Sequence, residues 1–498
     1  MSLLPPDKGA HMSHCRLCRW LVVMWCVLMS ACHAAETMKP VGTPAALVHA
    51  GISGFSRGVN LAGDFEVSPR GSWGAPIQDN YFDLIADAGF DHVRIPIRWT
   101  AHTGAAPQFR IDPAFFRQVD ALLDNAERTG LSVIINTHHF EALNEAPVRH
   151  RAQLLAIWKQ ISTRYRNRPL TVAFEINNEP AGAFDAQPEL WNAMAAETLE
   201  VIRHTNPRRW IMIGPVGFNH PEHLETLVLP DDKRLIATVH LYDPTGFTLQ
   251  GAPWMQPSPP TGITWSGAET TINTPWHIAG WDSMVTTEQG VSIEFKRKHA
   301  AFAVRRATHN APDQTSESTL LVSADRPFNA VALCNIWQDV VAAELLIKRS
   351  VNSQADIKTV ADLSGCSTIN SIAVQLDDDS LVSPLITSMH LCETETLVAD
   401  ICSSVLVTQR EYHQQVMQRT AQWALRQGVP MYLGEFGVFD PVHQRVDQQS
   451  KFRWITSVRQ AAEQYGIGWS FFEFANDFGV YDNVTKAWRQ PMLDALLE

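Results

Sequence analysis

The chain has 498 residues, 45% of them hydrophobic and 18% charged, so it is long enough to bury a sizeable core. Its formal net charge at pH 7 is −12, and its basic clusters amount to the short run 296–298. This charge balance argues against nucleic acid or an anionic lipid surface as a partner, and a neutral partner fits it better.

Residues 1–35 have the features of a signal peptide. Arg16 and Arg19 precede an apolar run, residues 20–31, that is too short to span a bilayer as a helix. Small residues follow it and permit cleavage. We therefore expect a secreted or periplasmic protein with no integral membrane segment after the signal is removed. The residues before Cys32 resemble a bacterial lipoprotein box, so a lipid anchor at Cys32 stays open.

Short apolar runs follow within residues 45–267, and the run Thr171–Ile176 is typical of them. It is too short for a helix and rich in strand formers, which predicts a buried parallel strand. Glu179 comes directly after this strand, and Glu435 comes directly after a similar run, Val429–Leu433. In a (β/α)8 barrel the carboxyl ends of the strands converge on one face. The two glutamates are therefore expected to face each other across one cleft.

Two facing carboxyl groups suit the hydrolysis of a glycosidic bond. One group protonates the leaving oxygen, and the other, about 5 Å away when configuration is retained, attacks the anomeric carbon. Eight short motifs, which follow one another along the chain around the two glutamates, support this interpretation. They are Arg57–Leu61, Gly71–Gly74, Asp91–Pro96, Asn136–His139, Asn178–Pro180, Thr238–Tyr242, Phe247–Ala252 and Gly434–Gly437.

This ordered set resembles glycoside hydrolase family 5, the cellulase family A of retaining β-glycanases. The resemblance implies an α/β fold, a (β/α)8 TIM barrel, and an endo-β-1,4-glucanase that acts on internal bonds of a β-glucan without a cofactor. A β-mannanase, a xyloglucanase, a mixed-linkage β-glucanase or a transglycosylase stays open. So does a polysaccharide-binding protein of low activity.

The resemblance also implies roles for single residues. Glu179 would be the acid/base and Glu435 the nucleophile. The supporting residues would be Arg94, which holds Glu435 ionised, Asn178, which bonds the sugar 2-hydroxyl, and His138, His240 and Tyr242, which line the site. His139 is a weaker candidate for substrate binding. A metal site built on His138 and His139 is not expected, because adjacent histidines on a strand point to opposite faces.

Two positions depart from the family pattern. The family usually has a tryptophan under the reacting sugar at the end of the eighth strand, and Phe472 stands there. Leu249 stands where the family loop commonly has histidine. A phenylalanine offers a smaller apolar face and no indole N–H, so we expect altered or reduced activity.

Sixteen tryptophans are more than a core of this size needs. Several fall in predicted loops at the catalytic face, and we select Trp73 and Trp254 as sugar-stacking residues. Each could instead be a packing residue.

The family pattern stops near Gly267 and resumes near Glu411, so residues 268–410 are predicted to be a β-rich subdomain inserted after strand 6. Residues 45–267 would then form strands 1–6 of the barrel, and residues 411–498 strands 7 and 8. Four cysteines lie in the insertion and could form two disulfides in three connectivities: Cys334, Cys366, Cys392 and Cys402. We expect the insertion to act as a lid or a structural element, with a carbohydrate-binding module as the alternative.

Overall fold

The computed structural model describes residues 53–70, 72–268, 407–441, 443 and 445–498 in full. Between 269 and 406 it describes only the backbone of the strands. The signal-peptide prediction, the lipid-anchor question at Cys32 and the position of Cys366 lie outside the described residues.

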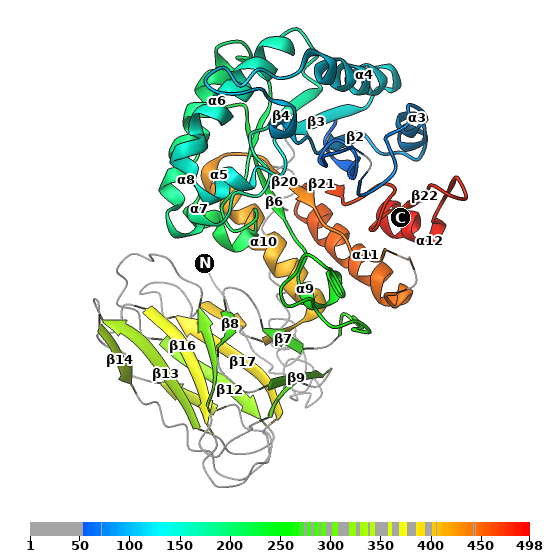
Figure 1. The fold of residues 1–498 in the computed structure, drawn as a ribbon. Coiled ribbons are helices and arrows are strands. Elements are labelled where there is room, and N and C mark those ends of the chain that lie inside the picture. The colour runs from blue at the N-terminus through cyan, green and yellow to red at the C-terminus, as the bar shows by residue number, and fades with distance from the viewer. Residues whose placement is uncertain are drawn as a thin grey trace, which may run out of the picture. The chain divides into compact units, whose positions relative to one another are not determined.

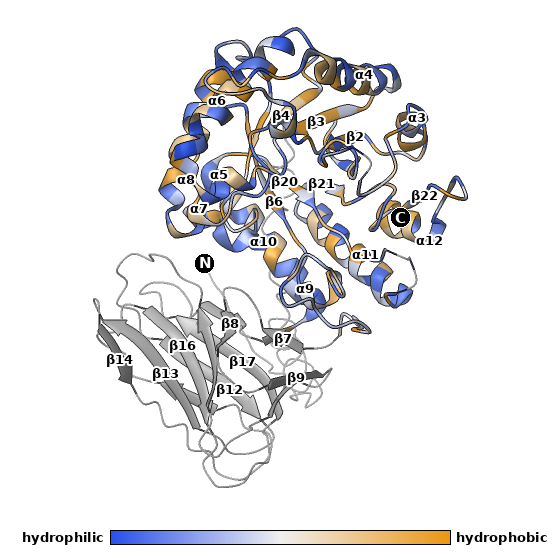
Figure 2. Ribbon diagram, viewed as in Figure 1, coloured by the Kyte–Doolittle hydropathy of each residue, from blue (hydrophilic) through white to orange (hydrophobic). Residues whose placement is uncertain are grey.

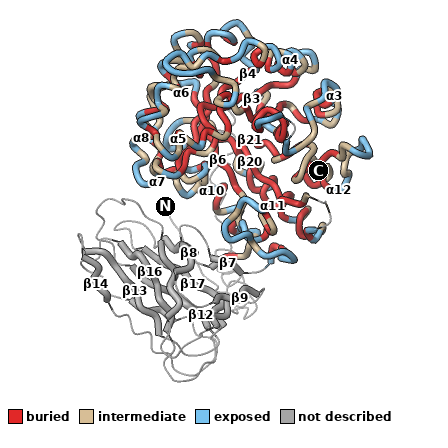
Figure 3. Tube along the Cα trace, viewed as in Figure 1, coloured by how far each residue is buried: buried red, intermediate tan, exposed pale blue. Residues whose placement is uncertain are grey.

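Eight parallel strands close into a barrel in the order β1-β2-β3-β4-β5-β6-β20-β21, which confirms the predicted (β/α)8 fold (Figure 1). Their bounds are β1 Arg57–Asn60, β2 His92–Ile95, β3 Ser132–Asn136, β4 Val172–Glu175, β5 Ile211–Ile213, β6 Leu235–His240, β20 Met431–Glu435 and β21 Gly468–Phe471. The strands are buried while the outer faces of the surrounding helices are exposed (Figure 3). This explains why the strands appear in the sequence as short, nearly continuous apolar runs.

Helices cover the outside of the barrel. They are α3 Asn80–Asp87, α4 Pro113–Thr129, α6 Pro147–Arg164, α8 Pro188–Arg203, α10 Gln409–Gln427, α11 Gln448–Gln464 and α12 Gln490–Leu497. A 3-10 helix, Pro221–Thr226, connects β5 to β6. Each long helix has apolar residues on the side that packs on the sheet and polar residues on the other (Figure 2).

Local signals set the helix ends. α4 begins after Asp112, whose side chain accepts a hydrogen bond from the Ala114 N–H, and it ends at Gly130 with a φ of 78°. α10 begins with a capping box between Thr408 and Glu411 and ends at Gly428 with a φ of 67°. These signals place α10 directly before β20.

The inside of the barrel has an apolar layer and, above it, a polar layer. The apolar layer contains Phe55, Ile134, Ala173, Met212, Ile236 and Tyr432. Side chains alternate along a strand, so the residue two positions further on points inward again. In β3 and β4 these residues are Asn136 and Glu175, both fully buried. The polar layer lies at the carboxyl ends of the strands, the end at which the candidate site is expected.

The chain between β6 and β20 contains a short helix, α9 Thr245–Thr248, and then the strands β7–β19 before α10. Two sheets have the orders β15-β12-β17-β10-β9 and β14-β13-β16-β11-β8, and β18 pairs with β17. The strands are β8 Trp276–Ala279, β9 Ser283–Thr287, β10 Gly290–Glu294, β11 Ala301–Arg306, β12 Ser318–Ala324, β13 Asn329–Ile336, β14 Asp339–Ala343, β15 Ile357–Val360, β16 Thr368–Gln375, β17 Leu385–Glu393 and β18 Ile401–Ser404.

A two-stranded stem joins the two ends of this segment. β7 Thr270–Ile272 pairs antiparallel with β19 Leu406–Thr408, and Thr408 then caps α10. In the sheets beyond the stem, Cys334 lies on β13, and Cys392 and Cys402 are partners in the register of β17 and β18. The disulfide hypothesis concerns side chains outside the described ones.

Candidate active site

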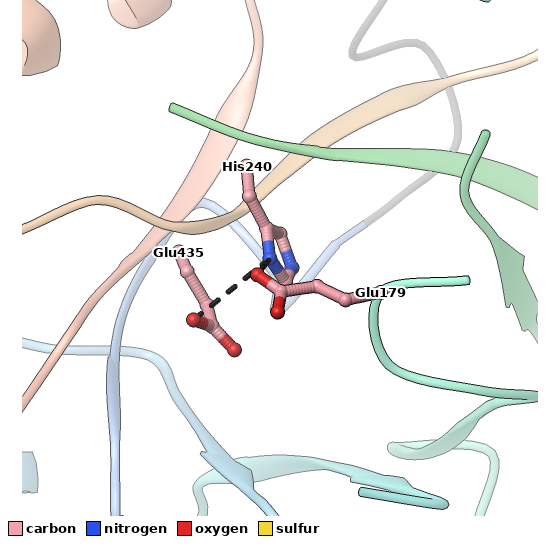
Figure 4. A group of neighbouring side chains, drawn as sticks. All are labelled: Glu179, His240 and Glu435. Carbon is pink, nitrogen blue, oxygen red and sulfur yellow. Dashed lines mark hydrogen bonds and ion pairs between the residues drawn. The ribbon is translucent and has the colours of Figure 1, made fainter. Parts of the chain in front are cut away.

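Glu179 and Glu435 come together above the polar layer of the barrel. Glu179 lies in the loop after β4 with a φ of 31°, and Glu435 is the last residue of β20. One carboxylate oxygen of each and one nitrogen of His240 lie within 4.8 Å of one another. Figure 4 shows these three side chains converging from separate segments of the chain. Two carboxyl groups at this spacing suit a reaction in which one attacks and the other transfers a proton.

Arg94, on β2, organises the polar layer. Its Nη1 donates to Glu435 Oε1 (2.7 Å) and to Asn60 Oδ1 (2.8 Å), and its Nη2 donates to Asn178 Oδ1 (2.7 Å). Its Nε and Nη2 also bind both carboxylate oxygens of Glu175, at 2.7 and 3.1 Å. The guanidinium is fully buried, and the carboxylates of Glu175 and Glu435 raise its pKa despite this burial. The structure thus places Arg94 and Asn178 beside the two glutamates.

Glu435 is held through both of its oxygens. Oε1 accepts from Arg94, and Oε2 accepts from the Tyr242 hydroxyl at 3.0 Å. Burial raises the pKa of Glu435, whereas the charge of Arg94 and its hydrogen bond act to lower it. The two donors leave the carboxylate fixed in one orientation.

Glu179 has a different environment. Burial raises its pKa to about 7; the charge of Arg94 opposes this rise and that of Glu175 adds to it. The Asn219 amide nitrogen lies 3.4 Å from His240 Nε2, and His240 Nδ1 lies 2.8 Å from Glu179 Oε1. Burial lowers the pKa of His240 to about 4, so this imidazole is neutral. Donation from Asn219 to Nε2 leaves the ring proton on Nδ1, where it binds Glu179.

The prediction that His138 and His139 point to opposite faces is wrong. β3 ends at Asn136 and His139 has a φ of 50°, so the rule of alternation no longer applies, and the two rings touch with centroids 4.4 Å apart. His138 is buried with its Nδ1 3.1 Å from the Asn136 amide. The partly exposed ring of His139 packs edge-on against Trp73 at 5.3 Å.

Trp73 and Trp254 are 57% and 55% exposed, which leaves both rings accessible. Trp254 also packs edge-on against Phe439, with centroids 4.7 Å apart. A third exposed aromatic residue, Phe218, was not expected from the sequence. It is 61% exposed in the loop after β5, and its N–H binds the carbonyl of Pro180, the residue after Glu179.

The two departures from the family pattern lie in one apolar cluster. Leu249 and Phe472 both pack against a group of buried residues, Ala252, Phe439 and Phe478, and Tyr242 packs against the same group. The rings of Phe472 and Phe478 are 5.3 Å apart and perpendicular. An apolar wall therefore adjoins the tyrosine that binds Glu435.

Sequence reasoning missed two acidic residues of this site, Glu175 and Glu473. Glu175 looks like part of an apolar run, and only the inward alternation along β4 could have indicated it. Glu66 and Glu473 are 4% exposed. Burial raises the pKa of Glu66 well above its ordinary value, and that of Glu473 to about 7. Oε2 of Glu66 is buried and has no hydrogen-bond partner among the described residues.

Glu179, His240 and Glu435 are close enough to hold a metal ion. Against this use, Arg94 and Tyr242 already bind the two oxygens of Glu435. The positive charge of Arg94, whose Nη1 lies 2.7 Å from Glu435 Oε1, also opposes a second cation. The arrangement favours a pair of reacting carboxyl groups.

Comparison with known proteins supports the same interpretation. The model of the family Cellulase (glycosyl hydrolase family 5) matches residues 51–291. Endoglucanase H of Acetivibrio thermocellus is 37% identical over 191 residues, which are 38% of this chain and 21% of that protein. Endoglucanase C of the same species is 27% identical over 217 residues, 41% of this chain and 62% of that protein. The chain thus spans less than two thirds of the length of these relatives.

Among solved structures, endoglucanase Cel5A of Thermotoga maritima is 26% identical with a TM-score of 0.59. The match covers 91% of this chain and all of Cel5A. Cel5A has been crystallised with cellobiose and with mannotriose as substrates.

Proposed function

Since the barrel of this chain belongs to glycoside hydrolase family 5, we propose that the protein is a retaining endo-β-1,4-glucanase. The observation that carries the proposal is the pair of carboxyl groups whose oxygens lie within 4.8 Å and whose surroundings differ. Glu435 is held by a cation and a hydroxyl, while burial raises the pKa of Glu179 to about 7, so that Glu179 keeps its proton below neutral pH. The first suits a nucleophile and the second an acid.

In the first step Glu435 attacks the anomeric carbon while Glu179 gives its proton to the glycosidic oxygen. The bond from the anomeric carbon to that oxygen breaks, a new chain end leaves, and the glycosyl group remains as an ester of Glu435. The Asn178 oxygen accepts from Arg94 and its side chain also bonds Glu179, so one of its two amide N–H groups is left for the sugar 2-hydroxyl.

In the second step water attacks the same carbon. Glu179, now a carboxylate, takes a proton from that water, and the ester bond to Glu435 breaks to restore the enzyme. Arg94 and Tyr242 stabilise the carboxylate of Glu435 as it leaves. Two inversions at one carbon give net retention.

A cellulose-like β-1,4-glucan is the leading substrate, in agreement with the endoglucanase names of the relatives. The mannotriose complex of Cel5A supports a β-mannan as the first alternative. Trp73, Trp254 and His139 would contact sugars further along the polymer, because they are accessible residues of the same face.

We also propose that the protein is exported, because a polymeric glucan lies outside the cell. The signal features of residues 1–35 support it. Within the part of the chain that the structure describes, no helix has the length and hydropathy needed to cross a membrane.

The test is a reducing-end assay on soluble β-glucans, mannan, xyloglucan and xylan, with Glu435→Gln as the matched inactive control. We expect release from β-1,4-glucans, with NMR showing the β-anomer of the product first. An α-anomer formed first would rule out retention. If the parent released no sugar and bound glucan as well as Glu435→Gln does, the protein would be a binding protein instead.

A further inference from the structure

Asp243, the residue that follows Tyr242, collects hydrogen bonds from three separate parts of the barrel. Its Oδ2 binds His220 Nε2 at 2.5 Å and the Tyr412 hydroxyl at 3.0 Å. Its backbone carbonyl accepts from Trp454 Nε1 at 2.9 Å and from His413 Nε2 at 3.2 Å. These donors come from the loop after β5, from α10 and from α11. No other residue of the loop after β6 has as many side-chain donors among the described contacts.

The donors are themselves fixed. Nδ1 of His413 lies 2.9 Å from the Ser457 hydroxyl, and the ring of Trp265 is stacked on His413 at 5.5 Å with an interplanar angle of 11°. Burial lowers the pKa of His413 to about 4, so the ring is neutral. Because the carbonyl of Asp243 can only accept, the single ring proton lies on Nε2. The position of Asp243 is therefore set by packed side chains with little freedom.

His220, the partner of Asp243, connects Asp243 to the surroundings of Glu179. Asn219, beside His220, accepts from the backbone N–H of His240 at 2.9 Å and places its amide 3.4 Å from His240 Nε2. The pair Asn219-His220 therefore contacts both ends of the segment from His240 to Asp243. Within that segment His240 binds Glu179 and Tyr242 binds Glu435.

His220 and Asp243 have the geometry of an ion pair. Burial opposes charge on both groups, but their mutual hydrogen bond and attraction raise the pKa of His220 and lower that of Asp243. The side chains are 25% and 27% exposed, and Glu222 lies 3.8 Å from the other nitrogen of His220. A partly buried pair of this kind is weak evidence for a role in stability. Asp243 instead lies close to the contacts of His240 with Glu179 and of Tyr242 with Glu435, which points to a role in positioning them.

We propose that Asp243, held by His220 and Tyr412, is a positioning residue that keeps Tyr242 on Glu435 and His240 on Glu179. This inference rests on the proposed function, because it concerns how the same two glutamates are aligned. A displacement of Tyr242 by about 1 Å is expected to lower turnover roughly 10- to 100-fold, since the attacking carboxylate loses its fixed orientation.

The test is a double-mutant cycle on kcat with the variants Asp243→Asn and Tyr242→Phe. Asp243→Asn alone should lower kcat with little change in KM. In the Tyr242→Phe background the same substitution should have a much smaller effect, because the contact that it positions is already absent. Equal fold-losses in both backgrounds, or an unchanged kcat in the single variant, would overturn the proposal.

The matched control is Asp232→Asn at the other end of β6. Asp232 forms an ion pair of similar exposure with Arg203 (2.6 Å). It precedes β6, however, so the length of the strand separates it from the glutamates. It should leave kcat unchanged. A loss of kcat in Asp232→Asn equal to that in Asp243→Asn would show a general stability effect.

A crystal structure of Asp243→Asn gives a readout that does not depend on turnover. The Tyr242 hydroxyl should move out of hydrogen-bond distance from Glu435, whereas an unchanged distance of about 3.0 Å would overturn the proposal. This measurement separates the two ideas, because it can succeed even if the parent protein hydrolyses no glucan.

Discussion

At the scale of single residues, the two glutamates differ in what holds them, and this difference predicts a pH dependence. In the proposed mechanism Glu179 must carry a proton in the first step, and its pKa is about 7. Activity is therefore present below that pKa and is lost as the pH rises through it. The alkaline limb of kcat/KM should fall near pH 7. A limb that persists in Glu179→Gln, assayed on an aryl glycoside with an activated leaving group, would contradict this assignment.

The two roles can be separated by chemical rescue. In Glu179→Ala the nucleophile remains, so azide should attack the glycosyl ester without a base and give a β-glycosyl azide. In Glu435→Ala azide should replace the nucleophile and give the α-azide. NMR of the products decides the matter. The same anomer from both variants would show that the roles are misassigned.

Phe472 and Leu249 predict a coupled effect, because both pack on the cluster of Phe439 and Phe478. We expect Phe472→Trp to lower KM on a soluble glucan about two- to tenfold, by the extra ring area and the indole N–H. Adding Leu249→His should change this effect, because neighbouring residues are not additive. Unchanged kinetics in Phe472→Trp would remove Phe472 from the sugar-binding surface.

The sequence indicated the residues that the structure brings together around Glu179 and Glu435, namely Arg94, Asn178, His240 and Tyr242. Each lies near or just after the carboxyl end of a strand, and these ends meet on one face. Glu175 and Asp243 could not be found in this way. The role of Glu175 depends on which side of β4 faces inward, and the partners of Asp243 lie up to 211 positions away in the chain. His139 was misjudged because a positive φ is not visible in the sequence.

At the scale of elements, strands and helix ends were predictable because their signals are local. β6, Leu235–His240, coincides with a run of apolar and strand-forming residues, and α10 begins at a capping box. The 3-10 helix between β5 and β6 was not expected. Its sequence, from Pro221 to Thr226, is too short for helical periodicity to be recognised.

The cap of α10 gives a prediction at this scale. Thr408 accepts from the Glu411 N–H at 3.2 Å and binds the Glu411 carboxylate in return. Thr408→Ala should lower the free energy of unfolding by about 1 kcal/mol. Thr163→Ala is the control, because that exposed hydroxyl binds only a carbonyl within its own helix. Equal destabilisation in chemical denaturation would show that the cap has no special role.

At the scale of the whole molecule, the stem of β7 and β19 predicts that the insertion can be removed. Paired strands are about 5 Å apart, so a two-residue turn can join them. A variant that keeps β7 and β19 and replaces residues 274–404 by Asn-Gly should fold and hydrolyse short oligomers at close to the parent rate. Loss of activity on polymer alone would assign the insertion to polymer binding. Loss on oligomers as well would contradict its independence from the barrel.

Arg94, the buried cation of the polar layer, has one more consequence. In the proposed mechanism, Arg94 balances Glu175 before reaction, and the remaining negative charge lies on Glu435 while Glu179 holds a proton. Once Glu435 becomes an ester it is neutral, and the charge has moved to Glu179. The net electrical charge of the interior is thus the same at every stage of the cycle. When Glu435 is a neutral ester, the pKa of Glu179 is lower, because the neighbouring negative charge is gone. This decrease comes only after Glu179 has transferred its proton.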